Sequence, residues 1–136
     1  MANLIKQQQD ILTKLNIHLL NPMQEEAISV INNTTNTILL SPTGSGKTLA
    51  FLLPLIKALD SSCNEIQALI LVPSRELAIQ IEQVVRSMGS GFKVNAVYGG
   101  RPMSKDKIEI KHVPAILIGT PGRIADHFAN NRFSKK

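Results

Sequence analysis

The sequence predicts a three-layer α/β/α sandwich with a mostly parallel sheet, and three observations lead to this expectation. Apolar runs of four to six residues recur along the chain. A turn with glycine or proline follows each run, and most of these turns lead into a segment of helical spacing. The runs alternate little between apolar and polar residues, which indicates strands that are buried on both faces. Strands that alternate with helices are typical of parallel sheets.

Two helices are expected before the first strand. Apolar residues at helical spacing predict the first of them: Leu4, Ile5, Ile11, Leu12 and Leu15. The second begins where Asn21 caps it and Pro22 occupies its first turn. Its buried stripe is expected at Ala27, Ile28 and Ile31.

Four strands are expected after these helices: Thr37–Leu40, Ala68–Val72, Lys93–Tyr98 and Ala115–Ile118. Helices should follow near Lys47, from Ser74 to Met88, and after Gly122, and Pro54 should bend the first of these three. The polar segment 130–136 should fray. Ligands of parallel sheets gather beyond the carboxyl ends of the strands, so the turns that follow the strands should share one functional edge.

Composition narrows the class of protein. The chain of 136 residues fits one domain, and 43% apolar with 18% charged residues indicates a folded rather than a disordered chain. The net charge of +5 favours polyanionic partners without proving one. Cys63 is the single cysteine, which excludes an internal disulfide and favours a reducing compartment. With no signal-peptide pattern and no apolar run long enough for a membrane span, we expect a cytoplasmic protein without membrane contact.

Gly46-Lys47-Thr48 ends a loop that closely matches the phosphate-loop pattern G-x-x-x-x-G-K-[ST], with Ser41 at the position of the first glycine. Glycines let the backbone approach a phosphate, and the amides at a helix start can bind it. Lys47 then reaches the outer phosphates, and the Thr48 hydroxyl suits Mg²⁺. The predicted nucleotide-binding residues here are Ser41, Thr43, Gly44, Ser45, Gly46, Lys47 and Thr48. The alternative is a glycine and serine turn that only caps a helix.

Each of three further segments, taken alone, has the pattern of an ordinary helix start. They are Asn21 to Gln24, which has the spacing of a capping box, Pro73 to Ala78, and Thr120 to Arg123. Their combination and order around the phosphate loop resemble the first RecA-like domain of the DEAD-box RNA helicases of superfamily 2. The resemblance places the Q motif at 16–24, motif I at 41–48, motif Ia at 73–78, the glycine doublet at 99–100 and motif Ib at 120–123. It divides the chain into Q-motif helices (1–35), sheet and helices (36–129) and a frayed tail (130–136).

The resemblance implies the roles of individual residues. Gln24 is expected to recognise adenine, and Lys47 and Thr48 are expected to act on the phosphates of ATP, with Mg²⁺ on Thr48. One RNA strand is expected to be held through its phosphates and sugars, without sequence readout. The residues that the resemblance assigns to RNA are Pro73, Ser74, Arg75, Gly99, Gly100, Thr120, Pro121, Gly122 and Arg123.

The chain departs from the family pattern at several positions. Ser41 and Ser74 replace the usual small residue and threonine, and no aromatic residue precedes Phe51, so adenine should lack its stacking partner and bind weakly. The Asp-Glu-Ala-Asp and Ser-Ala-Thr motifs do not occur in the 136 residues. We therefore expect an incomplete domain that hydrolyses ATP negligibly by itself, with an artificial or proteolytic boundary at Lys136. We also expect a gap in the sheet, which favours rearrangement, self-association or a partly open sheet.

Three functional readings follow from the sequence. The first is the N-terminal part of an ATP-dependent RNA helicase that unwinds short duplexes. The second is a nucleotide- or RNA-binding module that never catalyses. The third is another phosphate-loop NTPase, such as a DNA helicase or a small-molecule kinase.

Overall fold

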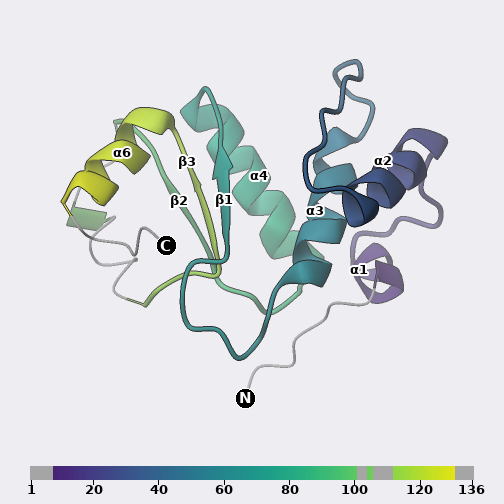
Figure 1. Ribbon diagram of the computed structural model, residues 1–136, viewed down its shortest axis with the longest axis horizontal. Helices are drawn as coiled ribbons and strands as arrows, with labels where there is room; N and C mark the ends of the chain where they lie inside the picture. The colour runs from purple at the N-terminus through teal and green to yellow at the C-terminus, as the bar shows by residue number, and fades with distance from the viewer. Residues whose placement is uncertain (1–7, 101–103, 106–111, 131–136) are drawn as a thin grey trace.

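The computed structural model describes residues 8–100, 104–105 and 112–130. Its helices are α1 (Gln8–Lys14), α2 (Pro22–Asn33), α3 (Lys47–Ala58), α4 (Arg75–Met88) and α6 (Pro121–Ala129), and its strands are β1 (Ala68–Leu71), β2 (Val94–Val97) and β3 (Ile116–Gly119) (Figure 1). Leu4, Ile5 and the tail beyond Asn130, for which a helix and fraying were predicted, lie outside the described residues. None of the helices in the described ranges has the length and apolarity that crossing a bilayer needs.

The three described strands form a parallel sheet in the order β1-β3-β2, so the strand that comes third in the sequence lies in the middle. Ile116 of β3 is level with Ala68 of β1 and with Val94 of β2. Two backbone hydrogen bonds continue the pairing past the strand ends, from Val72 N to Gly119 O (3.0 Å) and from Thr120 N to Val97 O (3.2 Å). The segments that follow the three strands therefore leave the sheet at one edge.

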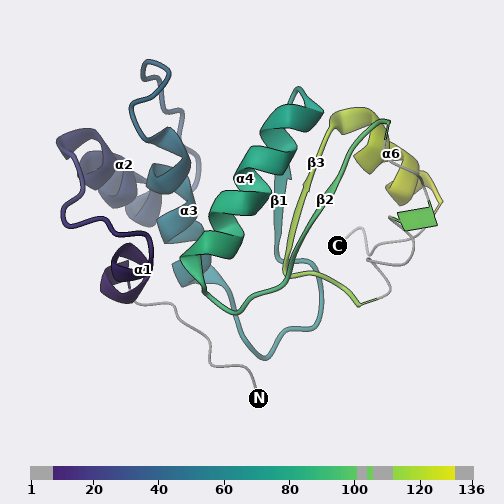
Figure 2. The ribbon, with the colours of Figure 1, turned by 180° about the vertical axis from the view of Figure 1, so that it is seen from behind.

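Helices cover both faces of the sheet. On one face, α4 packs Ile81 and Val85 into the main core, which includes Ile116 and Ile118 of β3. On the other face, Ile124 of α6 packs against Val97 and Leu117. Figures 1 and 2 show α4 and α6 on opposite sides of the strands. This arrangement confirms the predicted α/β/α layers.

The helices α1, α2 and α3 lie beside this sheet. Among these three helices, α2 packs most extensively against α3, and α1 packs against α4. Ile11 and Leu12 of α1 are buried, as the sequence predicts. The helix α3 continues through Pro54, which is buried together with Leu53 and Ile56. The predicted bend at Pro54 stays a prediction.

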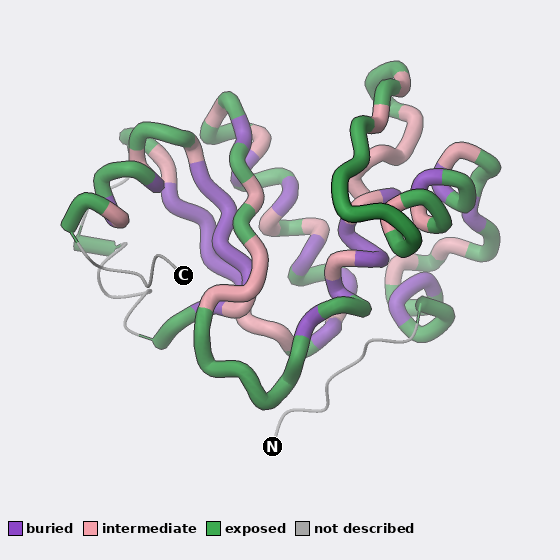
Figure 3. Tube along the Cα trace, viewed as in Figure 1, coloured by how far each residue is buried: buried purple, intermediate pink, exposed green. Residues whose placement is uncertain are grey.

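The predicted strand Thr37–Leu40 is wrong. This segment has no strand hydrogen bonds, and its Ile38 and Leu40 side chains are 88% and 89% exposed. The connection between α2 and α3, which contains it, runs apart from the three strands, and Figure 3 colours much of it as exposed. A strand requires a neighbour that pairs with its backbone, and a groove of about 860 Å³ separates this segment from β1. Strand-forming composition alone could not show that the neighbour is missing.

Candidate functional site

The start of α2 is held by a capping box. Asn21 Oδ1 accepts a hydrogen bond from Gln24 N (2.8 Å), and Gln24 Oε1 accepts one from Asn21 N (3.0 Å). The two side chains thus satisfy each other's backbone amides at the helix start. The structural reading of the Asn21 to Gln24 motif is therefore confirmed.

The same two side chains also hold the phosphate loop. Asn21 Nδ2 donates a hydrogen bond to Ser45 O (3.0 Å), and Gln24 Nε2 donates one to Gly46 O (3.2 Å). Gln24 is 7% exposed. Its amide has two donor hydrogens and two acceptor lone pairs, of which one of each is used here. One donor and one acceptor remain, so its predicted contact with adenine stays a prediction that the geometry permits.

Gly46 is required where it stands. Its φ of +91° lies in the left-handed region, and a Cβ atom there would come within 2.4 Å of Gln24 Nε2. Gly44 also has a positive φ, +84°, but no atom lies within 4 Å of a Cβ placed on it. Both glycines serve the turn, and only Gly46 also allows the close approach of α2.

Hydrogen bonds inside the loop hold it in a compact form. Ser41 Oγ donates to Ser45 Oγ (2.6 Å), and Ser45 Oγ donates to Pro42 O (2.6 Å). Ser45 N also donates a hydrogen bond to Pro42 O (3.3 Å), and Lys47 Nζ donates one to Ser41 O. Lys47 and the Ser45 amide, both predicted to hold phosphate, are thus bonded within the loop. A phosphate that enters must replace these bonds.

The helix α3 begins with its first-turn amides free for an anion. No side chain caps it at Gly46, in contrast to α2 and α4, which Asn21 and Ser74 cap. The first amides of a helix have no intrahelical acceptor and carry positive potential. The start of α3 therefore offers backbone N–H donors, and no side chain in the described ranges caps them. This is the geometry expected of a phosphate site.

The residues at this site fit Mg²⁺ only in part. Thr48 supplies one hydroxyl oxygen, and it lines the large groove together with Lys47. Within the described ranges, no group of three or more His, Cys, Asp or Glu side chains could hold a metal ion. A Mg²⁺ that binds through Thr48 must take its other ligands from phosphate oxygens and water, which is its usual preference in nucleotide sites.

A second set of predicted residues gathers at the carboxyl edge of the sheet. Ser74 caps α4, because its Oγ accepts a hydrogen bond from Leu77 N (3.2 Å). Arg75 follows it, and a Cβ placed on Gly100 would lie 3.1 Å from the Arg75 guanidinium. The φ of Gly100 is +87°. The Ser74-Arg75 segment after β1 and the Gly99-Gly100 turn after β2 are therefore neighbours.

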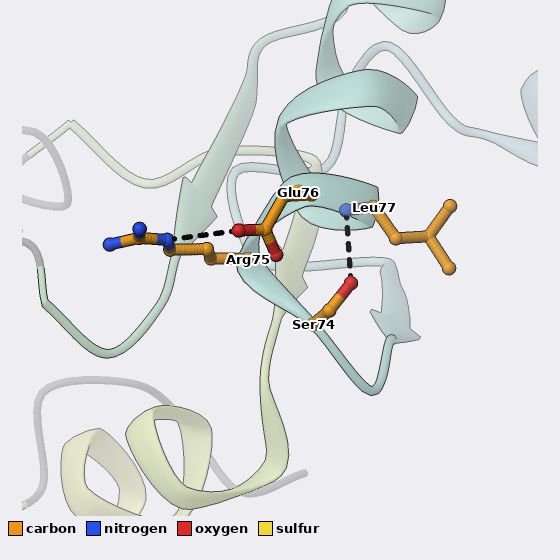
Figure 4. A network of polar contacts seen from close by, with 4 residues as sticks. All are labelled: Ser74, Arg75, Glu76 and Leu77. Carbon is orange, nitrogen blue, oxygen red and sulfur yellow. Dashed lines mark hydrogen bonds and ion pairs between the residues drawn. The ribbon is translucent and has the colours of Figure 1, made fainter.

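Arg75 has a carboxylate partner that the sequence analysis did not assign. Its Nε lies 3.2 Å from Glu76 Oε1, and both side chains are exposed. Figure 4 shows Arg75 and Glu76 joined by this contact and Ser74 below the Leu77 amide. The hydrogen bond from its own backbone amide, followed by the one from Arg75, lowers the pKa of Glu76 from 4.5. Glu76 therefore remains charged and competes with any anion for Arg75.

The helix α6 starts at the same edge, after β3. It begins at Pro121, with Thr120 as its N-cap residue and no side-chain capping bond, so its first-turn amides are also uncapped by a side chain. Gly122 has no atom within 4 Å of a Cβ placed on it, so the backbone is open there. The helix thus begins slightly earlier than the predicted start after Gly122. Ser74 differs from Thr120, because its hydroxyl already satisfies one α4 amide.

The predicted residues therefore form two groups. The nucleotide group joins Gln24 to the loop 41–48, and the nucleic-acid group joins 74–75, 99–100 and 120–123 along the sheet edge. Sequence reasoning missed that Asn21 binds Ser45 as well as capping a helix, and that Glu76 pairs with Arg75. The adjacency of Arg75 and Glu76 in the sequence was the available signal for that pair.

Solved structures of similar fold include two helicases. The chain superposes on a crystal structure described as a hypothetical ATP-dependent RNA helicase from Sulfolobus tokodaii with a TM-score of 0.80 and 25% identity, covering 93% of this chain and 38% of that one. It superposes on the yeast DEAD-box splicing factor Prp28 with a TM-score of 0.79 and 29% identity, covering 94% and 32%. Its parallel sheet, flanking helices and glycine loop define a RecA-like phosphate-loop domain.

The family follows from the sequence comparison. The DEAD/DEAH box helicase model matches residues 21–136, and the chain belongs to that family. It is 40% identical over 117 residues to the DEAD-box ATP-dependent RNA helicase RhpA of Helicobacter pylori, covering 85% of this chain and 24% of that protein. It is 40% identical over 126 residues to the ATP-dependent rRNA helicase rrp3 of Schizosaccharomyces pombe, covering 90% and 27%. The chain thus spans about a quarter of the length of these curated relatives.

Proposed function

We propose that this chain is the part of an ATP-dependent RNA helicase that binds ATP and the backbone of single-stranded RNA. Membership of the DEAD/DEAH box helicase family supports the proposal. The observation that carries it is the connection from Gln24 to Gly46, which places a side-chain amide beside a phosphate loop whose helix has no side-chain cap. An adenine-reading group and a phosphate-binding group are thus linked by one hydrogen bond.

In this function each part of the loop has a distinct task. The first-turn amides of α3 and the Lys47 ammonium bind phosphate oxygens, after Lys47 leaves Ser41 O. The Thr48 hydroxyl would be the protein's ligand to Mg²⁺, which would supply positive charge to neutralise the phosphates. The free donor and acceptor of Gln24 read adenine. The 136 residues contain no Asp-Glu-Ala-Asp motif, so we expect binding without hydrolysis.

A titration with fluorescent ADP and GDP in magnesium buffer tests the nucleotide site. We expect saturable binding of ADP only. Lys47→Ala should abolish it, whereas Lys57→Ala should not, because Lys57 carries the same charge in the last turn of the same helix. Equal loss in both variants would indicate nonspecific attraction. Equal binding of ADP and GDP would contradict the role of Gln24, and no binding would contradict a functional nucleotide site in these residues.

RNA binding is proposed along the sheet edge from 73–75 to 120–123. Arg75 beside Gly100 and the uncapped start of α6 support contacts to phosphates rather than bases. Binding of single-stranded RNA should then weaken with salt, and each lost phosphate contact should reduce the slope of log K against log salt by about 0.7. Arg75→Ala should show this reduction. Arg86→Ala, at the other end of α4, should leave the slope unchanged.

A further inference from the structure

We propose that the Ser41 hydroxyl acts as a latch: through Ser45 it holds the loop 41–46 closed, and it thereby opposes nucleotide binding. The latch regulates the proposed nucleotide site, and it rests on that proposed function. It also reverses the role of the Ser41 side chain, because the sequence pattern places Ser41 among the residues that hold phosphate. All the contacts that carry the proposal lie between residues 21 and 46.

The loop closes on itself in a tight turn. Ser45 N donates a hydrogen bond to Pro42 O (3.3 Å), which is the bond between the first and fourth residues of a β-turn. Gly44 is the third residue of this turn, and its φ of +84° has the sign that a type II turn requires there. The Ser45 amide is therefore already bonded within the loop. A phosphate can take this amide only after the turn has opened.

Two serine hydroxyls close the same turn a second time. Ser41 Oγ donates a hydrogen bond to Ser45 Oγ (2.6 Å), and Ser45 Oγ donates one to Pro42 O (2.6 Å). The Ser45 hydroxyl thus accepts one bond and donates the next, and hydrogen bonds in such a chain strengthen one another. Because Pro42 O accepts from both the amide and the hydroxyl of Ser45, the Ser41 hydroxyl stabilises the turn that occupies the Ser45 amide.

The helix α2 anchors the end of the turn. Asn21 Nδ2 donates a hydrogen bond to Ser45 O (3.0 Å), and Gln24 Nε2 donates one to Gly46 O (3.2 Å). These two bonds hold the carbonyl groups that follow the Ser45 amide. Opening of the turn therefore has to move its Pro42 end away from Ser45, and this movement breaks the bond between the two serine hydroxyls.

The strength of the latch is that of one neutral hydrogen bond. Ser41→Ala removes the donor, and it leaves the bond from Ser45 Oγ to Pro42 O in place. One such bond changes the ratio of closed to open loop by about twofold to tenfold. The apparent affinity of a ligand is proportional to the fraction of protein that can bind it, so a nucleotide that binds the open loop gains up to this factor.

Stopped-flow mixing of this chain with fluorescent ADP in magnesium buffer tests the latch. Ser41→Ala should raise the association rate constant by about twofold to tenfold and leave the dissociation rate constant unchanged, because the latch acts before binding. Ser87→Ala is the control, since Ser87 Oγ bonds to Gln83 O (2.8 Å) within α4, and both of its rate constants should equal those of the wild type.

Two results of this kinetic experiment would overturn the proposal. Faster dissociation of ADP from Ser41→Ala would show that the Ser41 hydroxyl contacts the bound nucleotide and supports binding. Association and dissociation rate constants equal to those of the wild type would show that the hydroxyl does not limit access to the loop.

A double-mutant cycle identifies the partner of the Ser41 hydroxyl. Ser45→Ala keeps the backbone amide but removes both hydroxyl bonds, so it should also speed association. In that background Ser41→Ala should have no further effect, because its acceptor is already gone. Independent, multiplicative effects of the two substitutions on the association rate constant would contradict a latch that acts through Ser45.

Amide hydrogen exchange separates the latch from the proposed nucleotide site, because it needs no nucleotide. The Ser45 amide should exchange about twofold to tenfold faster in Ser41→Ala than in the wild type, since its bond to Pro42 O opens more often. The Leu77 amide, which Ser74 Oγ caps, should exchange equally in both proteins if the fold is intact. Faster Ser45 exchange without ADP binding by either protein would support the closed loop and contradict the nucleotide site. Equal Ser45 exchange would overturn the latch.

Discussion

The side chain of Gln24 donates a hydrogen bond from Nε2 to the carbonyl oxygen of Gly46, 3.2 Å away. This one bond connects the first turn of α2 to the residue that precedes α3. Gln24 is buried, and its Oε1 accepts a hydrogen bond from the backbone N–H of Asn21. Its side chain is therefore held both at the start of α2 and by the phosphate loop. A change on either side of the bond should therefore affect the shape of the phosphate loop.

Gly46→Ala should destabilise the chain more than Gly44→Ala. Both glycines have a left-handed φ, where an alanine costs about 1–2 kcal/mol. Only the Cβ at position 46 meets Gln24 Nε2, at 2.4 Å, so Gln24 must move and lose its bonds, which adds about 1 kcal/mol. Urea unfolding of both variants measures the difference. Equal midpoints would show that Gln24 does not hold Gly46 in solution.

Asn21→Ala and Ser74→Ala form a matched pair, because each removes the cap of one helix. Each should lower the free energy of unfolding by about 1 kcal/mol. Asn21→Ala should in addition weaken ADP binding several-fold, because Asn21 Nδ2 also holds Ser45 O. Ser74→Ala should leave ADP affinity unchanged, since the bond that Ser74 Oγ makes within the described residues is to the Leu77 amide of its own helix start. A similar loss of ADP affinity in both would attribute the effect to stability alone.

Glu76→Gln should strengthen RNA binding. The substitution releases Arg75 from a carboxylate 3.2 Å away, and because exposed ion pairs are weak the gain in affinity should be small, up to about fivefold. Glu82→Gln is the control, because it removes the same charge from the same helix but releases Arg86 instead. Fluorescence anisotropy with labelled single-stranded RNA measures the RNA affinity of the two variants. An equal gain from both would indicate only the change in net charge.

The low pKa of Glu76 predicts how its contribution to stability depends on pH. A carboxylate whose pKa is lower in the folded chain stabilises the fold above its unfolded value, and it loses this contribution as the pH falls through the folded value. The difference in unfolding free energy between wild type and Glu76→Gln should thus be constant well above pH 4.5 and decrease below it. Urea midpoints from neutral to acidic pH measure it. A difference that grows on acidification would contradict the assignment.

Much of the fold follows from local sequence pattern, and the exception has a physical reason. The strands around Ile70, Ala96 and Ile118 were predicted because short apolar runs between helices indicate buried strands, and the sheet contains all three. The helix start at Pro22 could be predicted because its capping box is local, whereas α6, which has no side-chain cap, starts at Pro121, slightly before the predicted position. Thr37–Leu40 has the same local character, but pairing depends on a distant neighbour, which no local pattern records.

The candidate site divides in the same way. The phosphate loop and its glycines could be predicted from spacing, because close backbone approach requires glycine at fixed positions. The side-chain bonds from Asn21 and Gln24 could not, because they span more than twenty residues and depend on how α2 packs on α3. The hydrogen bond from Lys47 Nζ to Ser41 O could not be predicted from the sequence either, since a motif describes the residues of a loop and not its conformation without a ligand.

The central position of β3 has a consequence for the order of events on the ribosome. Among the described strands, β1 and β2 do not pair with each other, and both pair with β3, which follows them in the sequence. While residues 68–115 emerge, at about 5–20 residues per second, β1 and β2 have no strand partner, and α4 cannot yet close its core over Ile116 and Ile118. These three strands can therefore pair only after β3 has been made, because β3 lies between the two strands that precede it.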